Sequence, residues 1–120
     1  MDRQKTIVVV DDDESIRKTF NLVFNGNYRV CLAGDSREAL KRFDPASIDL
    51  IIADVRLPRV SGTEMISLFR RAGYGGPVIM ISGDPDSIDP SSLDSLRVAR
   101  FFVKPLDLET LAQSVRSLLN

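Results

Sequence analysis

Five short apolar runs alternate along the chain with segments of helical period. The first, Thr6–Val10, is continuous and β-branched, as a strand buried on both faces should be. The other runs are Tyr28–Ala33, Ile48–Ala53, Pro77–Ile81 and Arg100–Val103. Strands that alternate with helices favour a parallel sheet covered on both faces, because parallel neighbours need crossover connections. The alternation therefore predicts a doubly wound α/β fold.

Apolar residues recur at intervals of three or four between the runs, which indicates amphipathic helices. They are Ile16, Phe20, Val23 and Phe24, then Met65, Leu68, Phe69 and Ala72, and finally Leu108, Leu111, Ala112, Val115, Leu118 and Leu119. Ser61 with Glu64 forms a capping box, and Asp35 and Asp107 are expected to cap helices as well. The pair Arg70–Arg71 is expected to lie on a solvated helix face.

The segment 83–99 departs from a regular helical pattern. It contains Pro85 and Pro90, and a proline inside a helix removes a hydrogen bond and clashes with the preceding turn. Asp89 as a cap, with Pro90 at the first helical position, is nevertheless a good start signal. We therefore expect a loop over residues 83–89, followed by a short or irregular fourth helix.

Length, charge and hydropathy limit what the chain can do. Its 120 residues are expected to form one domain, residues 1–120, with a net charge of −1 that gives no general attraction to nucleic acid or to an anionic membrane. No apolar run approaches the ~18 residues of a membrane span. The first residues lack the layout of a signal peptide, so we expect a cytoplasmic protein.

The sequence has no histidine and one cysteine, Cys31. Serine–histidine and cysteine–histidine catalysis, typical zinc sites and an internal disulfide are therefore excluded. Cys31 is expected to be a small core residue in a strand. Any metal site must be built from oxygen atoms, which points to magnesium or calcium.

Polar residues follow four of the expected strands. They are Asp11, Asp12 and Asp13 after the first, Asp54 after the third, Ser82 after the fourth, and Lys104–Pro105 after the fifth. Each piece alone also fits a turn, a helix cap or a strand exit. Because parallel strands end at one edge of a sheet, however, the groups should converge there. Clustered carboxylates suit Mg²⁺, and a lysine and a hydroxyl suit a phosphoryl group, so the set predicts phosphoryl transfer with Asp54 as the nucleophile.

The motifs at these strand ends resemble the receiver domain of bacterial two-component response regulators. They read VVVDDDESIRK, DVRLPRVSG, MISGD and FFVKPL, and the resemblance extends from Ile7 to about Leu119. It implies a flavodoxin-like (CheY-like) three-layer sandwich with five parallel strands in the order 2-1-3-4-5. It also implies a phosphoprotein that works as a signalling switch and catalyses only its own phosphorylation and dephosphorylation.

The resemblance assigns the acceptor and the metal ligands by position. Asp54 matches the phospho-acceptor. Asp12 matches a direct ligand of Mg²⁺, and Asp11 matches an acid that acts mainly through water. The carboxylate of Asp54 and the backbone carbonyl of Arg56 complete the implied ligands, whereas Asp13 fills a position where the family requires no acid.

The resemblance also assigns the phosphate-binding and switch residues. Ser82 and Lys104 match the groups that bind the phosphoryl oxygens, and the peptide bond to Pro105 is often cis in the family. Ser82 and Phe101 match the pair that changes position on phosphorylation, which alters the face of the fourth helix, fifth strand and fifth helix. The implied partners are a histidine kinase or phosphotransfer protein, an output domain or protein, and a phosphorylation-dependent second copy.

Two other functions are compatible with such a sheet. A magnesium-dependent phosphohydrolase also uses a nucleophilic aspartate, but it usually has a second aspartate two residues later, where this chain has Arg56. It also needs a cap domain to enclose a substrate. The second alternative is a protein-binding module that is never phosphorylated. No basic stripe or spare helix-turn-helix predicts direct DNA binding.

Overall fold

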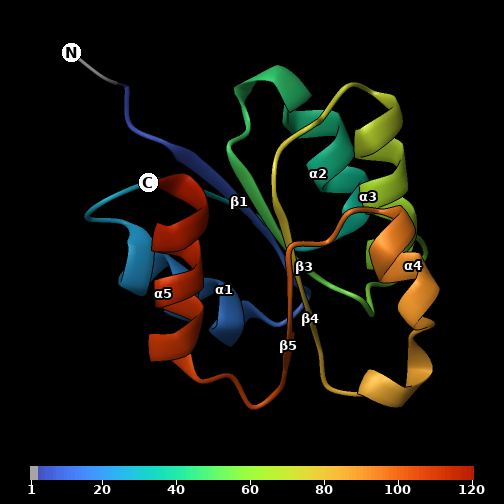
Figure 1. Ribbon diagram of the computed structural model, residues 1–120. Helices are drawn as coiled ribbons and strands as arrows, with labels where there is room; N and C mark the ends of the chain where they lie inside the picture. Colours follow the sequence, from blue (N-terminus) through green and yellow to red (C-terminus); the bar gives the residue numbers. More distant parts are fainter. Residues whose placement is uncertain (1–2) are drawn as a thin grey trace.

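The computed structural model describes residues 3–120, which form a five-stranded parallel sheet with helices on both faces (Figure 1). The strands are β1 (Thr6–Val10), β2 (Arg29–Ala33), β3 (Leu50–Asp54), β4 (Val78–Ser82) and β5 (Arg100–Val103). The helices are α1 (Glu14–Phe24), α2 (Ser36–Arg42), α3 (Gly62–Arg71), α4 (Pro90–Ser95) and α5 (Leu108–Leu119), with 3-10 turns η1 (Pro45–Ser47) and η2 (Pro85–Ser87). The strand order is β2-β1-β3-β4-β5, so the predicted fold is confirmed.

Three strands begin later than their apolar runs, each for a local reason. Tyr28 precedes β2 because its N–H donates to Phe24 at the end of α1, at 3.0 Å. Ile48 follows the turn η1 as its C-terminal cap. Pro77 has no N–H to give to a strand ladder, and β4 begins at the next residue. At their carboxyl ends, β3 and β4 extend one residue beyond the predicted runs, to Asp54 and Ser82.

The sheet separates two hydrophobic layers. On one face, α1 and α5 pack through residues such as Phe20 and Leu111; on the other, α2, α3 and α4 pack through residues such as Ala39 and Phe69 (Figure 1). Side chains along β1 alternate between the two layers, as the pleat requires, and every residue of β1, β3 and β4 is buried. This burial on both faces explains the continuous apolar runs of the sequence.

The expected helix caps are confirmed, whereas three apolar residues of the predicted helical stripes are exposed. The Oγ of Ser61 accepts the N–H of Glu64 at 3.2 Å, and the side chains of Asp35 and Asp107 likewise accept N–H groups of the first turns of α2 and α5. The exposed residues are Val23, Leu68 and Ala72, because the buried stripe of each helix is narrower than the sequence pattern. Within residues 3–120 no helix has the length and apolar character to cross a membrane.

The prolines shape the fourth helix as predicted. Residues 83–89 form a loop that contains the turn η2, and α4 follows with the side chain of Asp89 accepting the N–H of Ser91 at 3.0 Å. The expectation for Arg70 is wrong: its half-buried guanidinium donates hydrogen bonds to main-chain carbonyls, whereas Arg71 is exposed. Cys31 lies half-buried on the edge strand β2.

We expect Phe20→Ala to lower the free energy of unfolding by about 3–5 kcal/mol, because the ring is fully buried between α1 and the sheet. Leu22→Ala is the matched control, since this side chain on the same helix is 82% exposed. Its effect should stay within about 0.5 kcal/mol. Urea denaturation of both variants measures the difference, and equal losses would contradict the assignment of the α1 core face.

Candidate functional site

Four strand ends bring the predicted polar residues to one edge of the sheet. β1 and β3 pair directly, so that Asp11 and Asp12 emerge beside Asp54. β4 lies on the other side of β3, and β5 lies beyond it, so Ser82 and Lys104 complete the row. The N–H of Lys104 donates to the carbonyl of Ser82 at 2.9 Å, which ties these two ends together.

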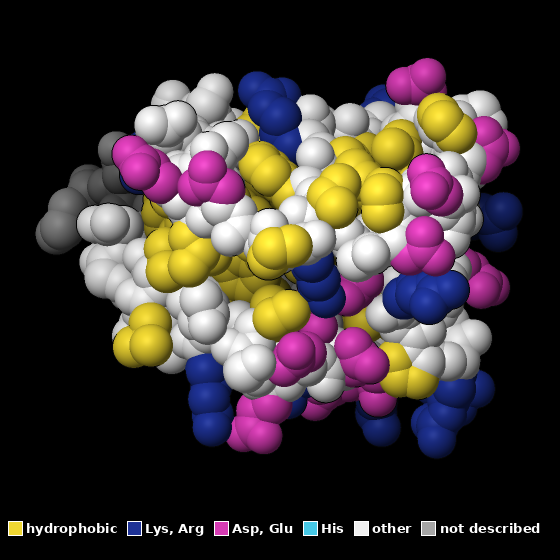
Figure 2. Space-filling model, turned by 90° about the horizontal axis from the view of Figure 1, so that it is seen from below, with side chains coloured by type: hydrophobic (Ala, Val, Ile, Leu, Met, Phe, Trp, Pro, Cys, Tyr) yellow, Lys and Arg dark blue, Asp and Glu magenta, His cyan; other side chains and the backbone are white. Residues whose placement is uncertain are grey.

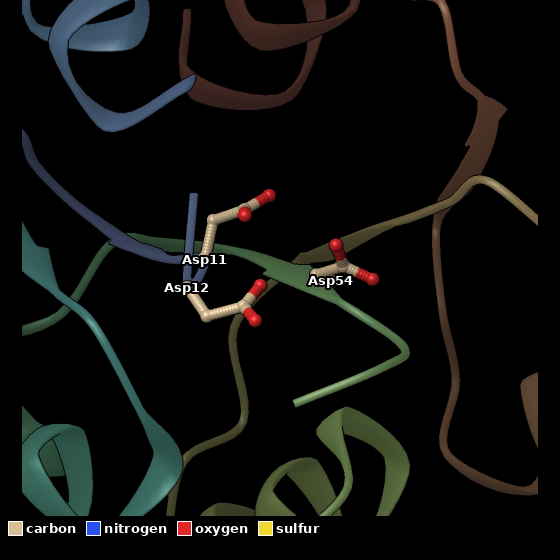
Figure 3. Close-up of side chains that lie close together, drawn as sticks. All are labelled: Asp11, Asp12 and Asp54. Atoms are coloured by element: carbon tan, nitrogen blue, oxygen red, sulfur yellow. The ribbon is translucent and has the colours of Figure 1, made fainter. Parts of the chain in front are cut away.

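Three carboxylates form the centre of the site. Ligand atoms of Asp11, Asp12 and Asp54 all lie within 4.8 Å of one another. Figure 3 shows the three side chains gathered between the end of β1 and the end of β3. Asp11 and Asp54 are buried and Asp12 is exposed, so the cluster opens to solvent on one side. The neighbouring Asp13 instead caps α1 through the N–H of Ser15, at 2.9 Å.

Asp11 is the most constrained of the three acids. Its Oδ1 accepts the N–H of Asp13 at 2.9 Å, whereas its buried Oδ2 has no hydrogen-bond partner among the described residues. The nearest cation, Lys104 Nζ, lies 3.4 Å from that oxygen as an ion pair. Burial raises the pKa of Asp11, and the hydrogen bond from Asp13 and the charge of Lys104 offset only part of the effect.

Asp54 is held at both carboxylate oxygens. Its Oδ1 accepts the N–H of Arg56 at 2.8 Å, and its Oδ2 accepts Lys104 Nζ at 2.6 Å. Burial lowers the pKa of Lys104, but the hydrogen bond to Asp54 and the charge of Asp11 outweigh it, so that this pKa is raised. The lysine is therefore a cation fixed between two acids. The peptide bond from Lys104 to Pro105 is cis.

The carboxylate cluster has the chemistry of a magnesium site. All its donors are oxygens, and Mg²⁺ prefers such ligands while keeping several waters. The unbonded Oδ2 of Asp11 lacks the partner that a buried carboxylate oxygen requires. A divalent cation held by Asp11 and Asp54 would offset the repulsion among the acids, and the exposed Asp12 could reach it as well. The residues present therefore fit the ion.

Ser82 and Arg56 extend the site toward the β4–α4 loop. Ser82 is buried, and its Oγ accepts the N–H of Asp84 at 3.0 Å, which leaves the hydroxyl hydrogen able to donate elsewhere. The guanidinium of Arg56 lies 3.7 Å from the carboxylate of Asp84. Both partners are exposed, so this ion pair is weak.

A groove of about 770 Å³ opens beside the cluster, between the β3–α3 loop and the start of α4. Its lining includes Asp12 and Arg56 on one side and Ile88 and Asp89 on the other. Figure 2 shows the face on which the strands end, where acidic side chains gather near the centre with basic and apolar ones among them. The site is therefore an open depression.

Phe101 lies away from the carboxylates, on the opposite end of β5. It is half-buried, pairs in register with Met80 and packs against the core layer beneath α3 and α4. The structure thus places Phe101 behind the other predicted site residues, which lie together at the edge: Asp11, Asp12, Asp54, Arg56, Ser82 and Lys104.

The sequence patterns did not single out two residues that shape the site. Gly62 begins α3, and a β-carbon there would overlap the backbone oxygen of Asp54, so only glycine fits this close approach. Its position directly after the cap Ser61 was the available signal. Arg17 donates from Nη1 to the backbone oxygen of Asp11 at 2.7 Å, and its place on α1 gave no such signal.

Comparison with known proteins gives a family for this geometry. Residues 7–116 match the family described as the response regulator receiver domain. The chain is 36% identical to response regulator MprA of Mycolicibacterium vanbaalenii over 116 residues, which are 94% of this chain and 49% of MprA. Chemotaxis protein CheY4 of Vibrio cholerae has a similar structure, with a TM-score of 0.85, 29% identity and coverage of 98% and 100% of the two chains.

The chain therefore belongs to the response regulator receiver domain family, the signalling domain of two-component systems. Response regulator TrrA of Thermotoga maritima, solved in complex with Mg²⁺–BeF, is 29% identical with a TM-score of 0.81, and the match covers 96% and 99% of the two chains. The chain spans about half the length of MprA and of the regulator PhoP of Bacillus subtilis, and 17% of the sensor kinase/phosphatase CqsS of Vibrio cholerae.

We expect Asp11→Asn to stabilise the metal-free protein at neutral pH, raising the midpoint of thermal unfolding by a few degrees. Folding raises the pKa of Asp11, so its ionisation costs stability once the pH exceeds the unfolded value of about 3.9. The gain should vanish well below that value, where the carboxyl is protonated in both states. Asp13→Asn is the control with the opposite sign, because bonds with Ser15 lower the pKa of Asp13. A gain that does not change with pH would contradict this account.

Proposed function

We propose that this receiver domain accepts a phosphoryl group on Asp54 with Mg²⁺ bound. The observation that carries the proposal is the convergence of the carboxylates of Asp11, Asp12 and Asp54 within 4.8 Å, with Lys104 Nζ 2.6 Å from Asp54. Asp11 is also buried beside Lys104 and two further acids, but the lysine Nζ lies 3.4 Å from Asp11 and only 2.6 Å from Asp54. The site thus offers one nucleophile with charge compensation already in place.

The chemical step is an in-line displacement at phosphorus. An oxygen of the Asp54 carboxylate attacks the phosphorus of a phosphohistidine or of a small acyl phosphate. A new O–P bond forms while the P–N or P–O bond of the donor breaks, and the bonding electron pair leaves with the donor. Catalysis of such a step is mostly positioning and charge neutralisation, and the N–H of Arg56 holds the carboxylate in place at 2.8 Å.

The surrounding groups bind what the step produces. Lys104 exchanges its bond to Asp54 for one to a phosphoryl oxygen, and Ser82 donates its free hydroxyl hydrogen to another. The metal would be held by Asp11, Asp12 and Asp54 together with the backbone carbonyl of Arg56. When bound, Mg²⁺ neutralises charge on the transferring group. The complex of the similar TrrA with Mg²⁺–BeF supports this part of the proposal.

The phosphoryl group then acts as a switch. It adds about −1.5 to −2 charge next to Ser82, which draws the hydroxyl and its loop toward the site. Phe101 packs into the space that this movement opens, and because it has no hydroxyl its response depends on packing alone. The altered face consists of α4, β5 and α5, where an output domain, a protein partner or a second copy binds.

The extent and partners of the domain are part of the same proposal. We take residues 1–120 as one receiver domain whose donor is a histidine kinase or phosphotransfer protein. Its relatives MprA and PhoP are about twice as long as the part that this chain matches, so we assign no output activity to these residues themselves. The only reaction we assign to this chain is its own phosphorylation and dephosphorylation.

The phosphohydrolase alternative has less support. Its acid/base position, two residues after the nucleophile, is occupied by Arg56, whose side chain extends toward Asp84 on the far loop. A guanidinium remains protonated and cannot serve as a general acid or base at ordinary pH. The groove beside the site is also open to solvent, so it could not enclose a substrate as a cap domain does.

Intact-mass measurement after incubation with acetyl phosphate and Mg²⁺ tests the acceptor. The wild type should gain the mass of one phosphoryl group, and Asp54→Asn should gain none, because the amide is not a nucleophile for this step. Asp44→Asn is the matched control, since Asp44 is an exposed helix cap and its variant should still be labelled. A singly labelled Asp54→Asn protein would show that the phosphoryl group goes elsewhere. Omission of Mg²⁺ should abolish labelling.

Ser82→Ala should be labelled on Asp54 but should switch poorly, because the hydroxyl that follows the phosphoryl group is missing. Amide chemical shifts of β5 around Phe101, compared before and after phosphorylation, measure the switch. We expect clearly smaller changes than in the wild type, and wild-type changes in Ser87→Ala, an exposed serine of the same loop. Full-sized changes in Ser82→Ala would remove Ser82 from the switch.

A further inference from the structure

Arg70 on α3 carries a guanidinium that is shared between two segments of main chain. Its Nε donates to the carbonyl of Leu96 at 3.0 Å, and its Nη2 donates to the carbonyl of Arg97 at 3.3 Å, both at the end of α4. Its Nη1 donates to the carbonyls of Tyr74 at 3.1 Å and Gly76 at 2.6 Å, in the α3–β4 loop. The guanidinium also lies 5.4 Å from the ring centroid of Tyr74.

The helix that Arg70 contacts is weak by itself. α4 has six residues, whereas helices shorter than about 12–15 residues are marginal without other contacts. It closes with a turn in which the N–H of Val98 donates to Leu93 at 2.9 Å. That bond does not use the carbonyls of Leu96 and Arg97, which take their donors from Arg70. The carboxyl end of α4 therefore depends on a side chain from α3.

The backbone at this helix end is also strained. Arg97 has a φ of +58°, a left-handed conformation that is usually occupied by glycine at the residue after a helix. A non-glycine residue keeps such a conformation only when its surroundings hold it. The bond from Arg70 to the carbonyl of this same residue supplies part of that restraint.

We propose that Arg70 is a positioning residue that fastens the end of α4 to α3. On the β4–α4 side of the site, this contact confines the response to phosphorylation to residues 83–92. The confinement rests on the proposed phosphorylation of Asp54, and the fastening does not. The other end of this segment is held weakly, by the exposed ion pair of Asp84 with Arg56 at 3.7 Å. Ser82 Oγ accepts the N–H of Asp84 at 3.0 Å, so a movement of Ser82 reaches this loop first.

Amide hydrogen exchange in the unphosphorylated protein tests the fastening. In Arg70→Met, the amides of Leu96, Arg97 and Val98 should exchange about tenfold faster relative to core amides of β4, because several hydrogen bonds to a charged donor are lost. Arg70→Lys should give a smaller increase, since one ammonium cannot reach both segments. Arg71→Met is the matched control and should match the wild type. Equal exchange in Arg70→Met and Arg71→Met would overturn the proposal.

A second substitution separates fastening from general destabilisation. Arg97→Gly removes the left-handed strain, so the end of α4 needs less restraint, and adding it to Arg70→Met should slow the exchange at Leu96 and Val98 again. No slowing would contradict the link between Arg70 and the strained residue. If Arg70→Met does not fold, Arg70→Lys with and without Arg97→Gly gives the same comparison.

Amide shifts on adding beryllofluoride with Mg²⁺ test the confinement. In the wild type, the changes on the β4–α4 side should end before residue 96, and in Arg70→Met they should extend through residues 96–98. Equal changes at residues 84–92 and 96–98 of the wild type would refute confinement. If beryllofluoride changes no shifts at all, the proposed function fails and confinement fails with it, while the exchange experiment still decides the fastening.

Discussion

The contact between Lys104 and two buried acids is the interaction on which the rest of the site depends. Its Nζ lies 2.6 Å from Asp54 and 3.4 Å from Asp11, so one cation offsets the repulsion of two carboxylates that come from different strands. Lys104 follows β5, Asp11 follows β1 and Asp54 ends β3, so the contact crosses the end of β4. A metal ion or a phosphoryl group at this edge adds charge beside Lys104, Asp11 and Asp54 and so alters the interactions among them.

Much of this arrangement could be predicted because topology determines it. Continuous β-branched runs such as Thr6–Val10 indicate strands buried on both faces, and parallel strands must end at one edge. That rule alone brings Asp11, Asp54, Ser82 and Lys104 together, whatever the details of the loops. The loop before α4 could also be predicted from the sequence, because Pro85 and Pro90 restrict the backbone locally.

The rest could not be predicted because it depends on distances between segments that are remote in sequence. Arg70 looked like half of a solvated pair, and nothing in its neighbours shows that the end of α4 lies within reach of its guanidinium. Likewise, the pattern on α3 favoured Leu68 over Ile66, although Ile66 is fully buried and Leu68 is exposed. A periodic stripe gives the face of a helix, and only tertiary packing decides how wide the buried part is.

The contact of Gly62 with Asp54 affects how the site can vary. Gly62 has no functional group, yet its N–H donates to the carbonyl of Val55 at 2.8 Å and its α-carbon lies against the backbone of the acceptor. Any side chain at this position must displace either α3 or Asp54. In a survey of all single substitutions, Gly62 would therefore tolerate as few replacements as Asp11, Asp12 and Asp54 do. The residue type at the start of α3 is thus restricted by its contact with the backbone of Asp54, independently of any ligand.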